Sequence, residues 1–259
     1  MIFGAMNNPS QDVFQEITQI ARSGFDFVDL TMEPPCAYPD LLDLKKVRNL
    51  LGNSGLKAIA HTAYYLPFNN PFASTRRSAV EEMKKVIRAA SKLGISHCNF
   101  HFDVPIGMSS YDQTVQWYVE SLDILVPFAA SKKVVLVMEN IPNKHKDQMK
   151  KIRQLMERVP RLGFHLDVAH AFLEGGMARI QEYLEALGQR MSHVHLSEND
   201  GSYDQHLPLG HYQGKGMEWP KIFGWLKDRG YDGTVTLEIF NGPQDGLVQS
   251  LKRAREWAR

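Results

Sequence analysis

Two short stretches of the chain combine ionisable side chains with the apolar residues typical of a buried strand. The first, FHLDVAHAF at residues 164–172, contains His165, Asp167 and His170. The second, SHVHLSENDGSYDQHLPLG, spans residues 192–210. Burying an ionisable group costs several kcal/mol unless the group is paired or binds a metal. Both stretches therefore indicate bound metal as the compensating charge.

Ionisable residues of the same kind end other strand-like segments or lie in the loops that follow them. The full set is His61, His101, Glu139, Asp167, His170, His195, Asp204, His206 and Glu238. A lone strand-end histidine is usually a hydrogen-bonded polar residue, and a lone glutamate often caps a helix or pairs with a lysine. So many carboxylates and imidazoles at one place would need a cation. Nitrogen and carboxylate oxygen without thiolate suit Zn²⁺, Mn²⁺ or Fe²⁺.

Short apolar runs alternate with longer amphipathic segments along the chain, and this alternation must position those residues. The runs predict strands at 1–6, 27–32, 57–62, 97–102, 134–140, 162–168, 191–197 and 234–240. The amphipathic segments predict helices at 11–24, 40–55, 75–94, 111–133, 146–159, 177–189, 218–230 and 244–258. Strand–helix units of about 30 residues each indicate a parallel sheet.

The number of units predicts an α/β fold with a single (β/α)8 TIM barrel that forms one domain over residues 1–259. An open, doubly wound sheet usually has a glycine-rich turn after its first strand, and here that turn is MNNPSQD. In a barrel, the carboxyl ends of the strands and their loops form the active-site mouth. We therefore expect the nine ionisable residues to converge there, with His165 and His193 one layer deeper in hydrogen-bonding roles.

The bulk composition is that of an ordinary globular protein. Of 259 residues, 43% are hydrophobic and 23% charged, and the formal net charge of +1 does not indicate a nucleic-acid-binding protein. Cys36 and Cys98 form no C-x-x-C motif. Neither a signal-like N-terminal segment nor a membrane-length apolar run is present in the sequence. We expect a cytoplasmic protein with no membrane association, and a homo-oligomer is compatible with the sequence.

Residues 57–240 resemble the xylose isomerase-like TIM-barrel superfamily, which includes sugar phosphate isomerases and epimerases and endonuclease IV (AP endonuclease family 2). The resemblance is carried by the order and spacing of HTAYYLPFNNP, NFH, MENIP, LDVAHAF, HVHLSEND, DQHLPLG and LEIF. It covers nearly the whole chain, because the order of the strands fits as well.

The epimerase branch implies one tight divalent metal site, Zn or Mn, held by Glu139, Asp167, His195 and Glu238. In that branch Glu139 and Glu238 transfer a proton on opposite faces of a small polyhydroxylated substrate, through an enediolate. His170 would contact a substrate hydroxyl, and we expect His61 and His101 to bind substrate as well.

The endonuclease IV branch implies instead up to three zinc ions and hydrolysis of abasic DNA, with additional ligands at His61, His101, His170, Asp204 and His206. DNA binding requires phosphate contacts from Lys or Arg and side chains that wedge into the base stack. The candidates are Arg76, Arg77, Lys144, Lys146 and Lys215, with Tyr64, Tyr65 and Leu66 as wedges. Acidic residues are expected around the same mouth at Glu33, Asp40, Asp103, Glu174, Glu198 and Asp200. This balance of basic and acidic residues favours a small polyhydroxylated substrate. DNA is a partner only under the alternative hypothesis of an endonuclease IV-like enzyme.

Two departures from the family pattern bear on the substrate. The loop at 208–217 belongs to the stretch LPLGHYQGKGM (207–217), which is longer than usual and lacks the usual acidic residue. Glu198 stands where aspartate is common. We expect both to lie at the mouth.

A third hypothesis is a barrel that binds metal or sugar without catalysis, but binding alone would not require the paired carboxylates of Glu139 and Glu238.

Overall fold

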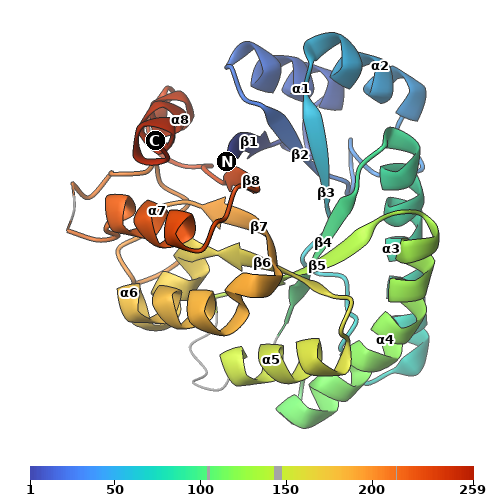
Figure 1. The fold of residues 1–259 in the computed structure, drawn as a ribbon. Coiled ribbons are helices and arrows are strands. Elements are labelled where there is room, and N and C mark those ends of the chain that lie inside the picture. The colour runs from blue at the N-terminus through green and yellow to red at the C-terminus, as the bar shows by residue number, and fades with distance from the viewer. Residues whose placement is uncertain (104–105, 143–147, 214) are drawn as a thin grey trace.

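Eight parallel strands close into a barrel in chain order in the computed structural model of the protein (Figure 1). The structure describes residues 1–259 except 104–105, 143–147 and 214. The strands are β1 Ile2–Met6, β2 Phe27–Thr31, β3 Lys57–His61, β4 His97–Phe102, β5 Val135–Asn140, β6 Gly163–Asp167, β7 Met191–Leu196 and β8 Thr234–Leu237. The pairing of β1 with both β2 and β8 completes the closure. The predicted (β/α)8 barrel is confirmed.

One helix follows each strand and covers the outside of the barrel (Figure 1). The helices are α1 Val13–Arg22, α2 Leu44–Ser54, α3 Ala73–Leu93, α4 Tyr111–Ser131, α5 Gln148–Arg158, α6 Val168–Leu187, α7 Trp219–Asp228 and α8 Gly246–Trp257, and a 3-10 turn, η1, spans Gly188–Arg190. Their apolar faces pack on the strands in a continuous hydrophobic core. This arrangement leaves the loops after the strands free to form one mouth.

Helix α6 begins directly after β6, and not at Met177 as the sequence predicts. Asp167 ends the strand and caps the helix, because its carboxylate accepts a hydrogen bond from the backbone N–H of His170 at 2.6 Å. The helix then bends at Gly175 and Gly176, where Gly176 has a φ of 67° that favours glycine. The predicted helix starts after this glycine pair, which in the structure is a bend within a longer helix.

Gly4 of β1 leaves room for the ring of Phe27, its neighbour on β2. The two residues are paired in the sheet, and Phe27 is fully buried. A Cβ atom on Gly4 would lie 2.4 Å from Cε2 of that ring. The close approach of the two strands at this point therefore depends on the absence of a side chain.

We expect Gly4→Ala to lower the free energy of unfolding by about 1–3 kcal/mol, the usual cost of overpacking a core. Chemical denaturation measures this change. The matched control is Gly52→Ala in α2, where a Cβ would meet nothing within 4 Å. This control should stabilise the protein by up to about 1 kcal/mol, because alanine favours helix. Equal stability of the two variants would contradict the packing described here.

Glu198 holds the loop that follows β7. Its side chain is fully buried, and its carboxylate accepts hydrogen bonds from the backbone N–H groups of His211 at 2.8 Å and Tyr212 at 3.4 Å. The indole Nε1–H of Trp219 donates to the same carboxylate at 3.2 Å. Glu198 therefore anchors the described part of the unusual 208–217 segment. The expectation that Glu198 is one of the acidic residues around the mouth is wrong.

We expect Glu198→Ala to lower the free energy of unfolding by about 2–4 kcal/mol, because it leaves the buried indole N–H of Trp219 and two partly buried backbone N–H groups without their charged acceptor. The same loss should loosen 208–217, which hydrogen exchange at His211 and Tyr212 would detect. Glu218→Ala is the control, since the Glu218 side chain is 53% exposed and its pair with Lys221 spans 3.4 Å. Its cost should stay below about 0.5 kcal/mol. Unchanged exchange in Glu198→Ala would show that the loop does not depend on this carboxylate.

Candidate active site

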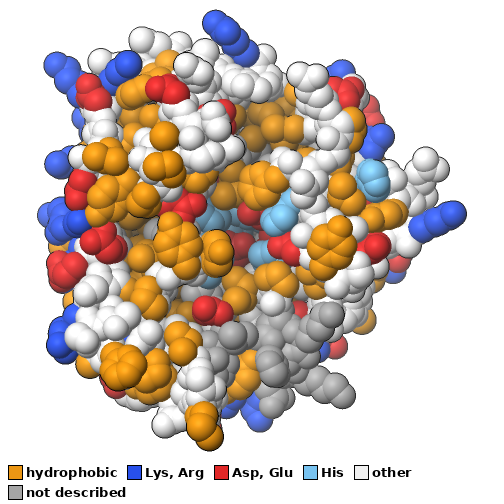
Figure 2. Space-filling model, turned by 180° about the vertical axis from the view of Figure 1, so that it is seen from behind, with side chains coloured by type: hydrophobic (Ala, Val, Ile, Leu, Met, Phe, Trp, Pro, Cys, Tyr) orange, Lys and Arg blue, Asp and Glu red, His pale blue; other side chains and the backbone are white. Residues whose placement is uncertain are grey.

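A cavity of about 900 Å³ opens at the carboxyl ends of the strands. Figure 2 shows this hollow face, with histidine and acidic side chains inside and hydrophobic side chains around it. All of the predicted site residues line the cavity except Asp167 and His195, which are fully buried beside it. The structure therefore brings the predicted set together.

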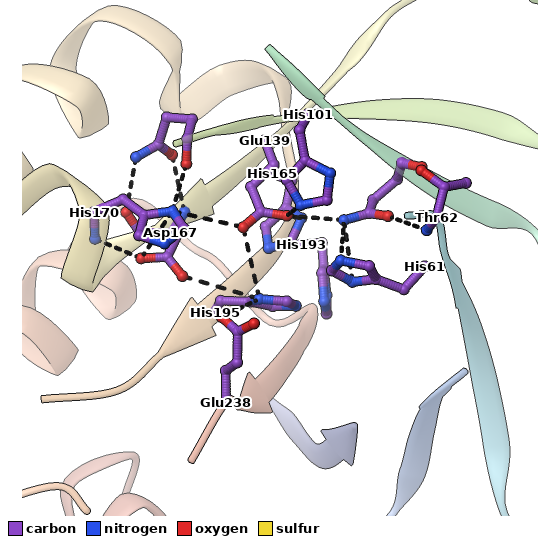
Figure 3. Close-up of polar contacts among 12 residues, drawn as sticks. His61, Thr62, His101, Glu139, His165, Asp167, His170, His193, His195 and Glu238 are labelled. Carbon is purple, nitrogen blue, oxygen red and sulfur yellow. Dashed lines mark hydrogen bonds and ion pairs between the residues drawn. The ribbon is translucent and has the colours of Figure 1, made fainter. Parts of the chain in front are cut away.

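Four of these residues form a compact group, the tetrad Glu139, Asp167, His195 and Glu238. They come from β5, β6, β7 and the residue after β8, and one potential ligand atom of each lies within 4.8 Å of all the others. The distances from His195 Nδ1 are 3.1 Å to Glu238 Oε2, 3.8 Å to Glu139 Oε1 and 3.9 Å to Asp167 Oδ2 (Figure 3). Three carboxylates thus face one imidazole nitrogen.

Hydrogen bonds among the described residues do not satisfy every oxygen of the tetrad, and a divalent cation would. Asp167 Oδ2 is buried and accepts no hydrogen bond from any residue that the structure describes. Burial and the charges of Glu238 and Glu139 raise the pKa of Asp167 to about 7, although His170 opposes the rise. A divalent ion would satisfy the free oxygen and compensate the repulsion between the carboxylates. The donor set of three carboxylates and one imidazole suits Zn²⁺ or Mn²⁺.

Glu139 also belongs to a second group, with His61 and His101. Potential ligand atoms of the three residues lie within 4.8 Å of one another, and His101 Nε2 is 3.1 Å from Glu139 Oε2. The Asn99 amide donates to Glu139 Oε2 at 2.8 Å and contacts both ring nitrogens of His61. Burial opposes ionisation of Glu139, but the neighbouring histidines, His165 first, hold its pKa well below the usual range. Glu139 is therefore a shared carboxylate at the centre of the site (Figure 3).

The third group consists of His170, Asp204 and His206. Asp204 Oδ2 lies 3.1 Å from His170 Nε2 and 2.9 Å from His206 Nε2. Burial disfavours the charged imidazoles, but Asp167 and Asp204 raise the pKa of His170 to about 10. Asp204 and Glu238 likewise raise the pKa of His206 to about 9 against the effect of burial. His206 has a left-handed φ of 47°, a strained conformation that is common at functional sites.

Sequence reasoning missed Asp29, a fully buried residue of β2. Its carboxylate contacts His193 and His195, two residues of β7 whose side chains lie inside the barrel. His193 thus has the hydrogen-bonding role predicted for it. His165 faces Glu139, with Nδ1 3.2 Å from Glu139 Oε2, but neither of its ring nitrogens makes a hydrogen bond to a described residue. The only available signal for Asp29 was an aspartate inside the apolar strand FVDLT.

The described part of the cavity wall contains no lysine or arginine. In Figure 2 the Lys and Arg side chains lie toward the edge of the face. Arg76, a predicted phosphate contact, pairs with Glu120 at 2.6 Å and donates to the backbone carbonyl of Asn70. Lys144 and Lys146 lie outside the described residues.

Only part of the predicted acidic rim is present. Glu33 and Asp103 line the cavity, but Asp40, Glu174, Glu198 and Asp200 do not. Asp40 pairs with Lys85 at 2.9 Å, and Glu174 accepts hydrogen bonds from Tyr183 within α6. Among the described residues of 208–217, none lines the cavity, which contradicts the expected place of this loop at the mouth.

Membrane insertion has no support in the helices of the described chain, since none of them is both long and apolar enough to cross a bilayer.

Comparison with known proteins yields relatives of two kinds. The probable endonuclease 4 of Thermotoga petrophila is 29% identical over 168 residues, which are 59% of this chain and 55% of the relative. The chain thus spans about half the length of that relative. Fructoselysine 3-epimerase of Shigella flexneri is 22% identical over 275 aligned positions, covering 97% of this chain and 94% of the relative.

A solved structure and a family profile show the fold and the family of this chain. The crystal structure of a D-tagatose 3-epimerase-like protein superposes with a TM-score of 0.87 and 22% identity, covering 99% of this chain and 97% of the other. This likeness shows a shared fold. The sequence profile of the family described as xylose isomerase-like TIM barrel matches residues 17–259. The chain therefore belongs to the xylose isomerase-like TIM-barrel family.

Proposed function

We propose that the protein is a divalent-metal-dependent isomerase or epimerase of a sugar or sugar derivative. The observation that carries the proposal is a pair of buried glutamates, Glu139 and Glu238, on a cavity whose described wall has no lysine or arginine. A pair of carboxylates suits proton transfer to and from carbon. A described wall without lysine or arginine suits an uncharged polyhydroxylated substrate. Fructoselysine 3-epimerase aligns over 94% of its length with 97% of this chain, which supports the same class of reaction.

The two glutamates are the proposed acid–base groups. Burial opposes ionisation of Glu238, but His195 and His206 lower its pKa below the usual value. Glu139 is also held ionised by its histidine neighbours. One carboxylate would remove a proton from the carbon beside the substrate carbonyl, which leaves an enediolate, and the other would return a proton to the opposite face or the adjacent carbon. His170, His61 and His101 line the cavity where they would contact substrate hydroxyl groups.

The proposed cofactor is one tightly bound Zn or Mn ion, held by Glu139, Asp167, His195 and Glu238. Such an ion supplies Lewis-acid chemistry, because it polarises a carbonyl oxygen and makes the neighbouring C–H group more acidic. The buried oxygen of Asp167 that lacks a hydrogen-bond partner among the described residues supports this choice of site. We propose that residues 1–259 form a single domain, and that the protein acts in the cytoplasm and without DNA.

A second candidate function is zinc-dependent hydrolysis of a phosphodiester in abasic DNA. It is favoured by the three neighbouring carboxylate–imidazole groups, which could hold up to three ions with His61, His101, His170, Asp204 and His206 as additional ligands. The partial alignment with a probable endonuclease 4 also favours it. Against it stands the described cavity wall, where phosphate groups would find acidic Glu33 and Asp103 and no lysine or arginine.

We expect removal of bound metal with a chelator to lower the melting temperature, because an ion that binds only the folded state stabilises it by mass action. At a free metal concentration of 100 times Kd the gain is about 2.7 kcal/mol, which corresponds to about 5–10 °C for a chain of this size. Differential scanning calorimetry with and without Zn²⁺ or Mn²⁺ measures the shift. Asp167→Asn should lose the shift, whereas the exposed-site control Asp200→Asn should keep it. A metal-independent melting temperature would contradict the proposed tetrad site.

We expect the metal-loaded protein to exchange a carbon-bound proton of a ketose or sugar-derived acid with solvent. Deuterium should enter the substrate in heavy water, as followed by NMR, because a carboxylate that has taken a proton can exchange it. Glu139→Gln and Glu238→Gln should each slow the exchange by about 10²–10⁴-fold.

Two controls make this experiment specific. Metal content must be measured in both glutamine variants, since each also changes a proposed ligand. Glu33→Gln changes a carboxylate that lines the same cavity but lies outside the tetrad, and it should retain exchange. Cleavage of an abasic-site duplex, with no deuterium in any of a broad panel of sugars, would favour the hydrolase instead.

A further inference from the structure

Asp29 lies in the interior of the barrel, in β2, and takes no part in lining the described cavity. Its Oδ2 atom accepts hydrogen bonds from His195 Nε2 at 2.8 Å, His193 Nε2 at 3.0 Å and Thr236 Oγ1 at 2.8 Å. Three close polar partners on one carboxylate oxygen are the arrangement of a hydrogen-bond acceptor, so His195 presents Nε2–H to Asp29.

This contact determines which nitrogen of His195 is available to a metal ion. While Nε2–H donates to Asp29, an ion can bind only at Nδ1, where it would replace any proton shared with Glu238. Nδ1 is the nitrogen that faces the tetrad, at 3.1 Å from Glu238 Oε2 and 3.9 Å from Asp167 Oδ2. A metal ligand needs a lone pair at the coordinating atom, so the contact with Asp29 selects the tautomer that can bind an ion in the tetrad.

We infer that Asp29 is a positioning residue for the metal site, which orients His195 with Nε2–H toward the barrel interior and Nδ1 into the tetrad. The inference rests on the proposed function, because it takes the tetrad to be the metal site. Carboxylates that accept from a metal-bound histidine usually change metal affinity by about 10–100-fold. Asp29 therefore acts on the site through His195 and not by contact with substrate.

A direct ligand role for Asp29 is the competing explanation. Asp29, His61 and His195 also have potential ligand atoms within 4.8 Å of one another, so a second ion in the barrel interior would use the same carboxylate. The separations of 2.8 and 3.0 Å from the two histidine nitrogens are ordinary N–H···O lengths. The hydroxyl of Thr236 donates to the same oxygen. These contacts show hydrogen bonding at Oδ2, whereas Oδ1 is buried without a hydrogen-bond partner among the described residues and lies 3.6 Å from His61 Nδ1. The number of bound ions therefore separates the two explanations.

The first experiment is a Zn²⁺ titration of metal-free protein in competition with a chromophoric chelator. We compare the unchanged protein with Asp29→Asn, which keeps the shape of the side chain but removes its charge. We expect the same number of tight sites and a Kd increased by about 10–100-fold. The matched control is Thr236→Val, which removes another donor to Asp29 Oδ2 without touching His195, and it should bind Zn²⁺ as tightly as the unchanged protein. Thermal unfolding of each metal-free variant establishes that it is folded.

The second experiment needs no change at Asp29, so it applies even if Asp29→Asn fails to fold. Nitrogen-15 NMR of histidine-labelled protein reports which ring nitrogen carries the proton, with the His195 signals assigned from a His195→Gln sample. We expect the proton of His195 on Nε2 and a large shift of Nδ1 when Zn²⁺ is added. Coordination through Nε2 would overturn the inference.

The affinity results separate this inference from the proposed function. Tight Zn²⁺ binding to Asp29→Asn with an unchanged Kd would overturn the role of Asp29 alone and leave the metal site standing. Loss of one ion of two, with the affinity of the other unaffected, would show Asp29 to be a ligand and would also overturn the positioning role. Failure of the unchanged protein to bind Zn²⁺ or Mn²⁺ would instead overturn the proposed metal site on which the inference rests.

Discussion

The site depends on how three buried carboxylates are compensated. Glu139, Asp167 and Glu238 face one another at the mouth of the barrel, where burial removes most of the screening that water would provide. Imidazoles surround these carboxylates and supply part of the compensation, most directly through His195. The free oxygen of Asp167 and its raised pKa show that, among the described residues, this compensation is incomplete. The chemistry that we propose follows from the cation that would complete it.

The barrel brings these groups together from distant parts of the chain. Each strand ends at the same face, so the tetrad needs only one side chain from each of four consecutive strand ends, β5 to β8. Neighbouring side chains then restrict the freedom of the ligands. Asn99 holds Glu139 from β4, and Asp29 holds His195 from across the barrel interior. A rigid set of oriented donors is what a metal site and an acid–base pair both require.

Much of this arrangement could be predicted from the sequence, because it follows from periodicity. Alternating strand-like and helix-like segments predict a (β/α)8 barrel, and strand-end positions place Glu139, Asp167, His195 and Glu238 side by side. The contacts of Asp29 could not be predicted in this way, since its partners His193 and His195 lie 164 and 166 residues further along the chain. Glu198 was expected at the mouth because it follows a strand, but the fold of its loop turns the side chain inward. Local sequence does not determine that direction.

The measurement that tests the account most directly is the metal-to-protein ratio of protein purified without added metal. Elemental analysis should find one tightly bound Zn²⁺ or Mn²⁺ per chain, because the tetrad provides four ligands in a buried, preformed arrangement. A ratio of three zinc ions per chain would favour the zinc-dependent phosphodiester hydrolase over the isomerase or epimerase. Protein that contains no divalent metal, and that takes up neither ion on dialysis, would contradict the central claim that the buried carboxylates are a metal site.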